Sequence, residues 1–187
     1  AQTALKWVRD GNKNKAESLI ERIVEVAKDA HTDVRESILS LRTGSDPDWS
    51  LIPVLKKYVD RFQANYGIQA ELSIPDEIID NTFDPAAGVQ LLRVIQEAKN
   101  NCRKHSGAHI LKIGVELDGN KAFITVSDDG HGFDPDRVER EGNGHFGLAF
   151  MRERMAQLGG SLKIDSRPGG GTVLRLDVPI HKKLGES

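Results

Sequence analysis

The feature that most constrains this chain is a stretch without glycine or proline from Lys15 to Arg42. Apolar residues recur along it at steps of three and four, which predicts one helix with a single apolar stripe. At about 1.5 Å per residue this helix is roughly 40 Å long, more than a small domain needs. The stripe consists of Leu19, Ile23, Val26, Ala30, Val34, Ile38 and Leu41.

The residues on either side of this helix predict a helical hairpin. Ala1–Val8 has the character of the end of another helix, and Arg9–Asn12 that of the turn between the two. Residues 1–42 are therefore expected to be the remnant of a hairpin whose second helix is 15–42 and whose first arm is mostly missing. Residues 43–48 are rich in helix breakers and are expected to be a linker.

The rest of the chain alternates helix and strand patterns. The predicted order is a helix ending at Gly67, a strand over 68–74, a helix over 84–105, two strands over 111–117 and 122–126, a helix over 148–158, and strands over 161–166 and 172–179. This order indicates an α+β fold, a two-layer sandwich in which helices cover one face of a mixed sheet. Residues 49–182 are expected to form this domain, with a tail at 183–187.

Composition excludes several functional classes. A formal net charge of −2 gives no reason to expect a nucleic-acid partner. Apolar runs never exceed four residues, so no membrane contact is expected within this chain. The single cysteine, Cys102, can form no internal disulfide and favours a reducing, cytoplasmic location.

The helix predicted over 84–105 has a polar edge that could carry chemistry. At 100° per residue, Glu97, Asn101 and Lys104 fall within an arc of about 60°. Carboxylate and amide oxygens suit Mg²⁺, and an ammonium beside them suits a phosphate. The alternative is a solvated helix edge whose charges only pair with one another.

Two glycine-containing loops could hold a ligand. In Asp128–Gly132, two glycines let the backbone pass close to a ligand, and Asp128 offers an acceptor for the exocyclic amine of adenine. A tight turn is the alternative. Gly142–Leu148 directly precedes a helix, an arrangement that binds phosphate because the free N–H groups face the anion. The charged segment Asp134–Glu141 is expected to be mobile, as a lid would be. Gly169–Thr172 alone is typical of a plain hairpin loop.

The order and spacing of these elements resemble the N, G1, G2 and G3 boxes of the ATP-binding fold shared by histidine kinases, gyrase-type topoisomerases, heat-shock chaperones and mismatch-repair ATPases. Sensor histidine kinases of the nitrate/nitrite-sensor type are the most similar subgroup. The motifs are Gln96-Glu97-Ala98 with Asn101 and Lys104-His105, Asp128-Asp129-Gly130 with Gly132-Phe133, His145-Phe146-Gly147-Leu148, Met151–Arg154, Leu158–Gly160, and Pro168-Gly169 with Gly171-Thr172.

The resemblance implies a Bergerat-type fold, ATP and Mg²⁺ as ligands, and a role for each matching residue. Asn101 would be the Mg²⁺ ligand, Glu97 would orient the metal's water or the attacking group, and Lys104 would contact phosphate. Asp128 would bind the adenine amine. The remaining binding residues would be Gly130 and Gly132 beside the base, Gly144, Gly147 and Leu148 on the phosphate side, and Thr172 near the purine. Lys99-Asn100 stands where the subgroup often has a small apolar residue followed by another polar residue. These two positions lie off the arc of Glu97, Asn101 and Lys104, so the assignment of that arc is unaffected.

The same resemblance implies a protein-histidine kinase that serves a response regulator and dimerises through the hairpin in the full-length parent. The family's acceptor histidine motif does not occur in this sequence. His31 is expected to be an ordinary polar helix position; a nucleophilic role is the disfavoured alternative. A serine kinase of the anti-sigma-factor type is one alternative, which the long helix disfavours. A non-catalytic nucleotide-binding regulator is another, which the presence of Glu97, Asn101 and Lys104 disfavours.

Overall fold

The computed structural model describes residues 8, 12–21, 23, 24, 27, 49–79, 82–141 and 146–180. Contacts divide the chain into two units, Ala1–Ser45 and Asp46–Ser187. In the first unit, residues 13–21 are helical, as are the described residues up to 27. Several predicted segments lie outside the described residues. They are residues 28–42 of the predicted helix, residues 1–7, the linker 43–48 and the tail 183–187.

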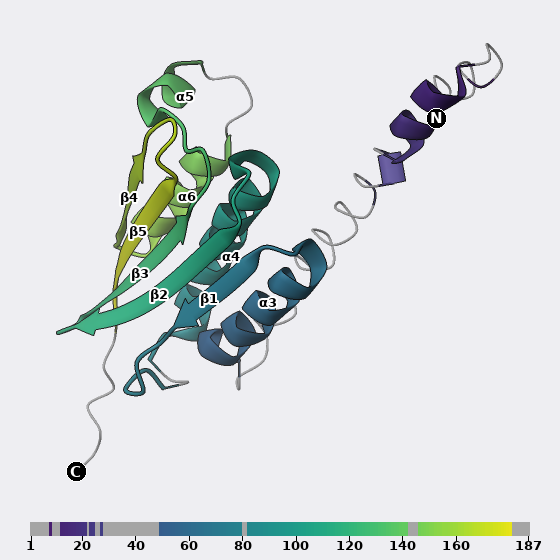
Figure 1. The fold of residues 1–187 in the computed structure, drawn as a ribbon. Coiled ribbons are helices and arrows are strands. Elements are labelled where there is room, and N and C mark those ends of the chain that lie inside the picture. Colours follow the sequence, from purple (N-terminus) through teal and green to yellow (C-terminus); the bar gives the residue numbers. More distant parts are fainter. Residues whose placement is uncertain are drawn as a thin grey trace. The chain divides into compact units, whose positions relative to one another are not determined.

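Within the described part of the second unit, the centre is a five-stranded sheet with the order β1-β2-β3-β5-β4 (Figure 1). The strands are β1 (Gln69–Ser73), β2 (Ile110–Asp118), β3 (Lys121–Asp128), β4 (Ser161–Ser166) and β5 (Thr172–Pro179). β1 runs parallel to β2, and the other neighbours pair antiparallel. The predicted α+β class with a mixed sheet is confirmed.

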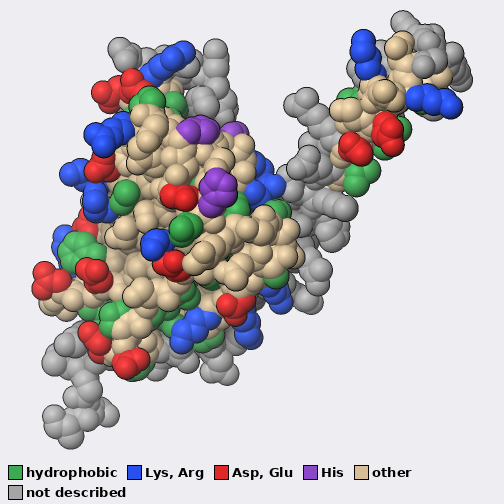
Figure 2. Space-filling view, in the orientation of Figure 1, with side chains coloured by type: hydrophobic (Ala, Val, Ile, Leu, Met, Phe, Trp, Pro, Cys, Tyr) green, Lys and Arg blue, Asp and Glu red, His purple; other side chains and the backbone are tan. Residues whose placement is uncertain are grey.

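The two faces of the sheet differ because side chains alternate along each strand. On the buried face, Ile113 lies opposite Val126, which in turn lies opposite Leu174. Helices α3 (Leu51–Tyr66), α4 (Pro85–Asn101) and α6 (Phe146–Gln157) contribute to the same core. Figure 1 shows α4 and α6 behind the sheet and α3 beside β1. Figure 2 shows the opposite side of this unit, where Lys, Arg, Asp and Glu side chains are interspersed. The core therefore lies in one layer between sheet and helices.

Local sequence signals explain where α3 and α4 begin and end. Gly67 adopts a left-handed φ of 67° after α3, and its N–H donates to the carbonyl of Gln63 at 3.1 Å. Asp84 precedes α4 and accepts the N–H of Ala86 at 2.9 Å, with Pro85 at the first helical position. Both boundaries agree with the predictions from sequence.

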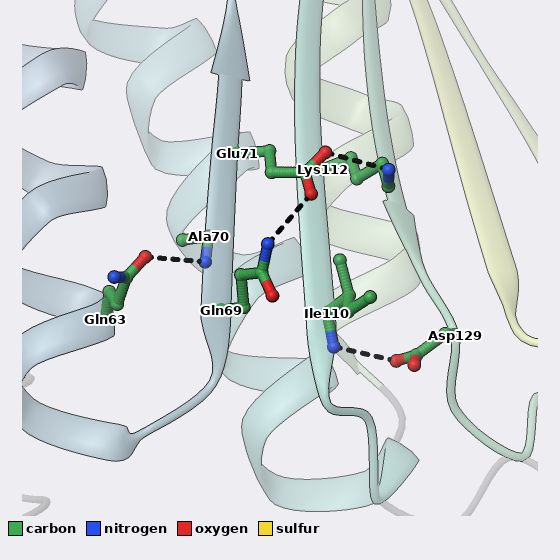
Figure 3. Close-up of polar contacts among 7 residues, drawn as sticks. All are labelled: Gln63, Gln69, Ala70, Glu71, Ile110, Lys112 and Asp129. Carbon is green, nitrogen blue, oxygen red and sulfur yellow. Dashed lines mark hydrogen bonds and ion pairs between the residues drawn. The ribbon is translucent and has the colours of Figure 1, made fainter.

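Side-chain contacts fix β1 to both of its neighbours (Figure 3). The N–H of Ala70 donates to Oε1 of Gln63 on α3 at 3.0 Å. On the other side, Glu71 accepts a hydrogen bond from Gln69 at 3.1 Å and forms an ion pair with Lys112 of β2 at 2.8 Å. The edge strand is thereby attached to the helix beside it as well as to the sheet.

Two turns show how the remaining strands and helices connect. Gly119 in the turn between β2 and β3 has a φ of 59°, whereas Asn120 has no positive φ, which fits a type II′ hairpin turn. The segment Asp134–Glu141, expected to be a mobile lid, contains the short helix α5 (Pro135–Glu141). Asp134 accepts the N–H of Asp136 at 3.0 Å, so the same Asp-Pro signal that begins α4 also begins α5.

Candidate functional site

Asp128 lies at the end of β3 on the helix-covered face of the sheet, because it alternates with the buried Val126. Its Oδ1 accepts the N–H of Gly130 at 2.9 Å. Its carboxylate also accepts a hydrogen bond from the side chain of Thr172, the residue opposite it on β5. Burial raises the pKa of Asp128, and the nearby negative charge of Asp129 adds to this effect. A half-buried carboxylate in this position can accept a hydrogen bond from an amine.

Gly130 and Gly132 allow the loop after β3 to approach other backbone segments. A Cβ at Gly130 would lie 2.4 Å from the carbonyl oxygen of Ser106. Gly132 has a φ of 60°, and a Cβ there would lie 2.2 Å from the carbonyl oxygen of Arg167 and 2.5 Å from that of Gly171. These glycines are therefore required by contacts within the protein, whether or not they also line a base pocket.

Glu97 of α4 and Gly147 of α6 are in direct contact. A Cβ at Gly147 would lie 2.1 Å from Oε1 of Glu97. About two helical turns away along both helices, Arg154 of α6 donates to the side chain of Gln90 on α4. A carboxylate is favoured at the first turn of a helix, where N–H groups lack helical partners. The structure thus brings Glu97 to the start of α6, where Leu148 is half-buried; Gly144 lies outside the described residues.

Asn101 and Lys104 lie on either side of a change in helix geometry. Asn101 is the last residue of α4, and Lys104 belongs to a π-helical turn, η1 (Cys102–Ser106). The predicted helix reaches its expected end near His105, but its last turn is π-helical, so each residue there advances by less than the 100° assumed for the ligand arc. Asn101 is half-buried and Lys104 is exposed. Only the Glu97–Asn101 part of the arc therefore has regular α-helical spacing.

Lys99 has a structural role that the sequence analysis missed. Its side chain is 1% exposed, and its ammonium lies 4.5 Å from the ring centroid of Tyr58 and 5.5 Å from that of Phe62. The guanidinium of Arg103 lies 4.8 Å from the ring of Tyr66. These cation–π contacts join α4 and η1 to α3. Aromatic residues four apart on α3 were the signal that could have indicated this packing.

Cys102 is not a candidate nucleophile. It is buried within the π-helical turn, and burial raises the pKa of its thiol to about 11. The thiol form, which is a poor nucleophile, therefore predominates at neutral pH.

No helix in the described ranges is long and apolar enough to cross a membrane.

Comparison with known proteins identifies the family. Residues 86–182 match the family described as Histidine kinase-, DNA gyrase B-, and HSP90-like ATPase. The chain is 34% identical over 177 residues to the signal transduction histidine-protein kinase/phosphatase DegS of Brevibacillus brevis, covering 95% of this chain and 42% of DegS. It is 31% identical over 173 residues to the oxygen sensor histidine kinase NreB of Staphylococcus carnosus, covering 90% and 46%. The chain thus spans less than half the length of these curated relatives.

Solved structures show the same fold. The histidine kinase domain of the blue-light activated kinase EL346 from Erythrobacter litoralis superposes with a TM-score of 0.59 at 20% identity, covering 72% of this chain and 63% of that one. The histidine kinase AdeS of Acinetobacter baumannii gives a TM-score of 0.57 at 16% identity, covering 97% and 93%. At these identities the likeness concerns the fold alone.

Fold and site together define an ATP-binding domain built as a two-layer sandwich. The chain belongs to the histidine kinase-, DNA gyrase B- and HSP90-like ATPase family. The predicted superfamily and the use of ATP are confirmed. The individual roles of Glu97, Asn101, Lys104, Asp128 and Thr172 stay predictions, as do those of the glycines and Leu148.

Proposed function

We propose that this chain carries the catalytic domain of a sensor histidine kinase, which transfers the γ-phosphate of ATP to a histidine on the first helix of a hairpin. The contact between Glu97 and Gly147 is the observation that carries this proposal. It sets a carboxylate at the start of α6, one helical turn from the amide of Asn101. A bound triphosphate at this helix start would have both side chains beside it.

Adenine recognition is assigned to the other end of the site. Asp128 would accept the exocyclic amine of adenine, and Thr172, which donates to the same carboxylate, would hold its orientation. Guanine carries a carbonyl where adenine carries an amine, so a carboxylate in this position disfavours it. Lys104, which is exposed on the π-helical turn, would neutralise phosphate charge. The histidine imidazole would form a bond to phosphorus as ADP leaves, a step that depends mainly on positioning and charge neutralisation.

The available donors fit Mg²⁺ only as a metal shared with the nucleotide. Among residues with a described position, no three His, Cys, Asp or Glu side chains gather in a metal site. Mg²⁺ commonly takes one or two protein oxygens and completes its shell with phosphates and water. Asn101 would supply an amide oxygen, with Glu97 one turn away to orient a coordinated water. The metal would neutralise charge on the phosphates when bound.

The wider setting follows from the named relatives. DegS and NreB are histidine kinases, so we infer a response regulator as the protein that receives the phosphoryl group from the histidine. Residues 1–42 would belong to the hairpin through which the parent dimerises. We place this part of the parent in the cytoplasm, where ATP and the response regulator are found.

Trans-phosphorylation tests the proposal. Purified chain is mixed with γ-labelled ATP and with a separate protein that carries the family's histidine helix. We expect acid-labile phosphate on the supplied helix and none on this chain, because the acceptor motif is absent from its sequence. Acid-stable phosphate on a supplied protein would indicate a serine kinase instead. ATP binding without any transfer would favour a non-catalytic regulator, and either result would overturn the proposal.

A further inference from the structure

Two loops beside Asp128 are joined by a set of backbone hydrogen bonds that the family motifs do not explain. The N–H groups of His109 and Ile110 both donate to Oδ1 of Asp129, each at 2.8 Å. The N–H of Asp129 donates to the carbonyl of Ile110 at 3.3 Å, and that of His131 donates to the carbonyl of Ser106 at 2.8 Å. Figure 3 shows Asp129 reaching the start of β2 at Ile110. We name these five residues the loop clamp.

The loop clamp begins where regular strand pairing ends. The last paired residues of β2 and β3 are Leu111 and Asp128. The backbone N–H of Ile110, the residue before Leu111, donates instead to the side chain of Asp129. The backbone is thereby held on both sides of Asp128, the residue proposed to bind adenine. The β3 ladder holds the residues before it, and the loop clamp holds the residues after it. Removing the clamp would free the peptide bond that directly follows Asp128.

The loop clamp also connects the two halves of the candidate site. Ser106 ends the π-helical turn that contains Lys104, and it is buried. Its hydroxyl donates to the carbonyl of Cys102 at 2.6 Å and accepts the N–H of Ala108 at 3.0 Å. Because Ser106 is fixed in this way, its carbonyl gives His131 a rigid acceptor. The loop that directly follows Asp128 is thus bonded to the end of the π-helical turn, which continues the helix that carries Glu97 and Asn101.

Asp129 itself is suited to hold this geometry without touching a ligand. Its carboxylate is exposed and ionised, since the backbone N–H groups of Ile110 and His109 lower its pKa. Hydrogen bonds to a charged acceptor are shorter and stronger than neutral ones. A single oxygen that accepts two successive N–H groups fixes both the position and the direction of the loop.

We propose that Asp129 is a positioning residue for nucleotide selection: by accepting the N–H groups of His109 and Ile110, it fixes the loop that aims Asp128 at the base. This inference rests on the proposed adenine role of Asp128. A residue that aims Asp128 should affect discrimination between ATP and GTP, because only the base distinguishes the two nucleotides. A loss of general stability would weaken both nucleotides equally.

The test compares variants of the whole chain by calorimetric titration with ATP and with GTP. Asp129→Ala should lower ATP affinity by about tenfold and reduce the ATP-to-GTP ratio by a similar factor, as expected when hydrogen bonds to a charged group are lost. Asp129→Asn keeps an oxygen in the same place and should stay within about threefold of the parent. Asp177→Ala is the matched control, because this aspartate also holds two partners, Ser161 and Lys121, away from the site.

Three results would overturn the inference. The first is that Asp129→Ala binds ATP as tightly as the unmutated chain does. The second is that Asp129→Asn loses as much affinity as Asp129→Ala. The third is that the affinities for ATP and GTP fall equally. If Asp129→Ala fails to fold, Asp129→Glu keeps the charge but shifts the oxygens by one methylene, and it should still reduce the ATP-to-GTP ratio. A parent chain that binds neither nucleotide would overturn the proposed function together with this inference. If the unmutated chain prefers ATP and the Asp129 variants keep the same ATP affinity and the same ATP-to-GTP ratio, this inference alone is overturned.

Discussion

The packing of Gly132 gives the sharpest test of the site's architecture. Gly132 combines a left-handed φ of 60° with two close backbone neighbours, the carbonyl oxygens of Arg167 and Gly171. Replacing it with alanine adds a Cβ at 2.2 Å and 2.5 Å from these oxygens. Neither oxygen belongs to a flexible side chain, so the loop after β3 and the loop before β5 would have to move apart.

Two contributions set the expected loss of stability. A left-handed φ costs a residue with a Cβ about 1–2 kcal/mol. Forcing an extra methyl group into a packed site costs about 1–3 kcal/mol. Gly132→Ala should therefore lower the free energy of unfolding by about 2–5 kcal/mol, a large part of the roughly 5–15 kcal/mol typical of a native protein. ATP affinity should fall as well, since the displaced loop directly follows Asp128.

Urea unfolding, followed by circular dichroism, measures this loss as a shift of the midpoint at constant slope. Gly119→Ala is the matched control, because Gly119 has a φ of 59° but no atom within 4 Å of its added Cβ. The control should lose only about 1–2 kcal/mol. The difference between the two variants isolates the packing contribution. Equal losses would refute the argument that backbone contacts, rather than φ alone, require glycine at 132.

Further predictions concern ligands and pH. Asp128→Asn should weaken ATP binding by about 1–3 kcal/mol in calorimetry while the fold stays intact. Asn101→Ala should abolish the tightening of ATP binding by Mg²⁺, whereas Glu97→Gln should spare affinity and slow transfer to a supplied histidine helix. The hydroxyl of Ser161 lowers the pKa of Asp177 in the folded state. The carboxylate therefore stabilises the fold above its unfolded pKa of about 4, and this contribution is lost as pH falls through the folded value. In Asp177→Asn, the urea midpoint should change less with pH over that acid range than it does in the unmutated chain.

Local patterns were sufficient to predict most of the fold. β4 and β5 begin and end at the residues that alternation and the neighbouring glycines indicated. The start of α4 was equally clear, because Asp84 and Pro85 are adjacent signals that act within one helical turn. Boundaries of this kind depend on residues next to one another in the sequence, so one sequence is enough to locate them.

Features that depend on distant partners could not be predicted from the residues next to them in the sequence. The burial of Lys99 depends on aromatic side chains presented by α3, and a lysine within a polar-looking segment gives no local sign of them. The contact between Glu97 and Gly147 joins two helices that are separated by a hairpin and α5 in the chain. The π-helical turn ends at Ser106, whose carbonyl accepts the N–H of His131 from the loop after β3, a partner 25 residues away in the chain. In each case the resemblance named a residue, but only packing defined its surroundings.

The mixed pairing of the sheet has a consequence for how the site is assembled during folding. β2 and β3 form a hairpin across two residues, a local contact that closes early at low entropic cost. β1 and β2 are parallel, so they can pair only after the chain has crossed over through α4. Asp128 is carried by the hairpin, and Glu97 and Asn101 are carried by the crossover. The two ends of the proposed nucleotide site therefore belong to contacts of different range, and the end proposed to bind phosphate should be completed last.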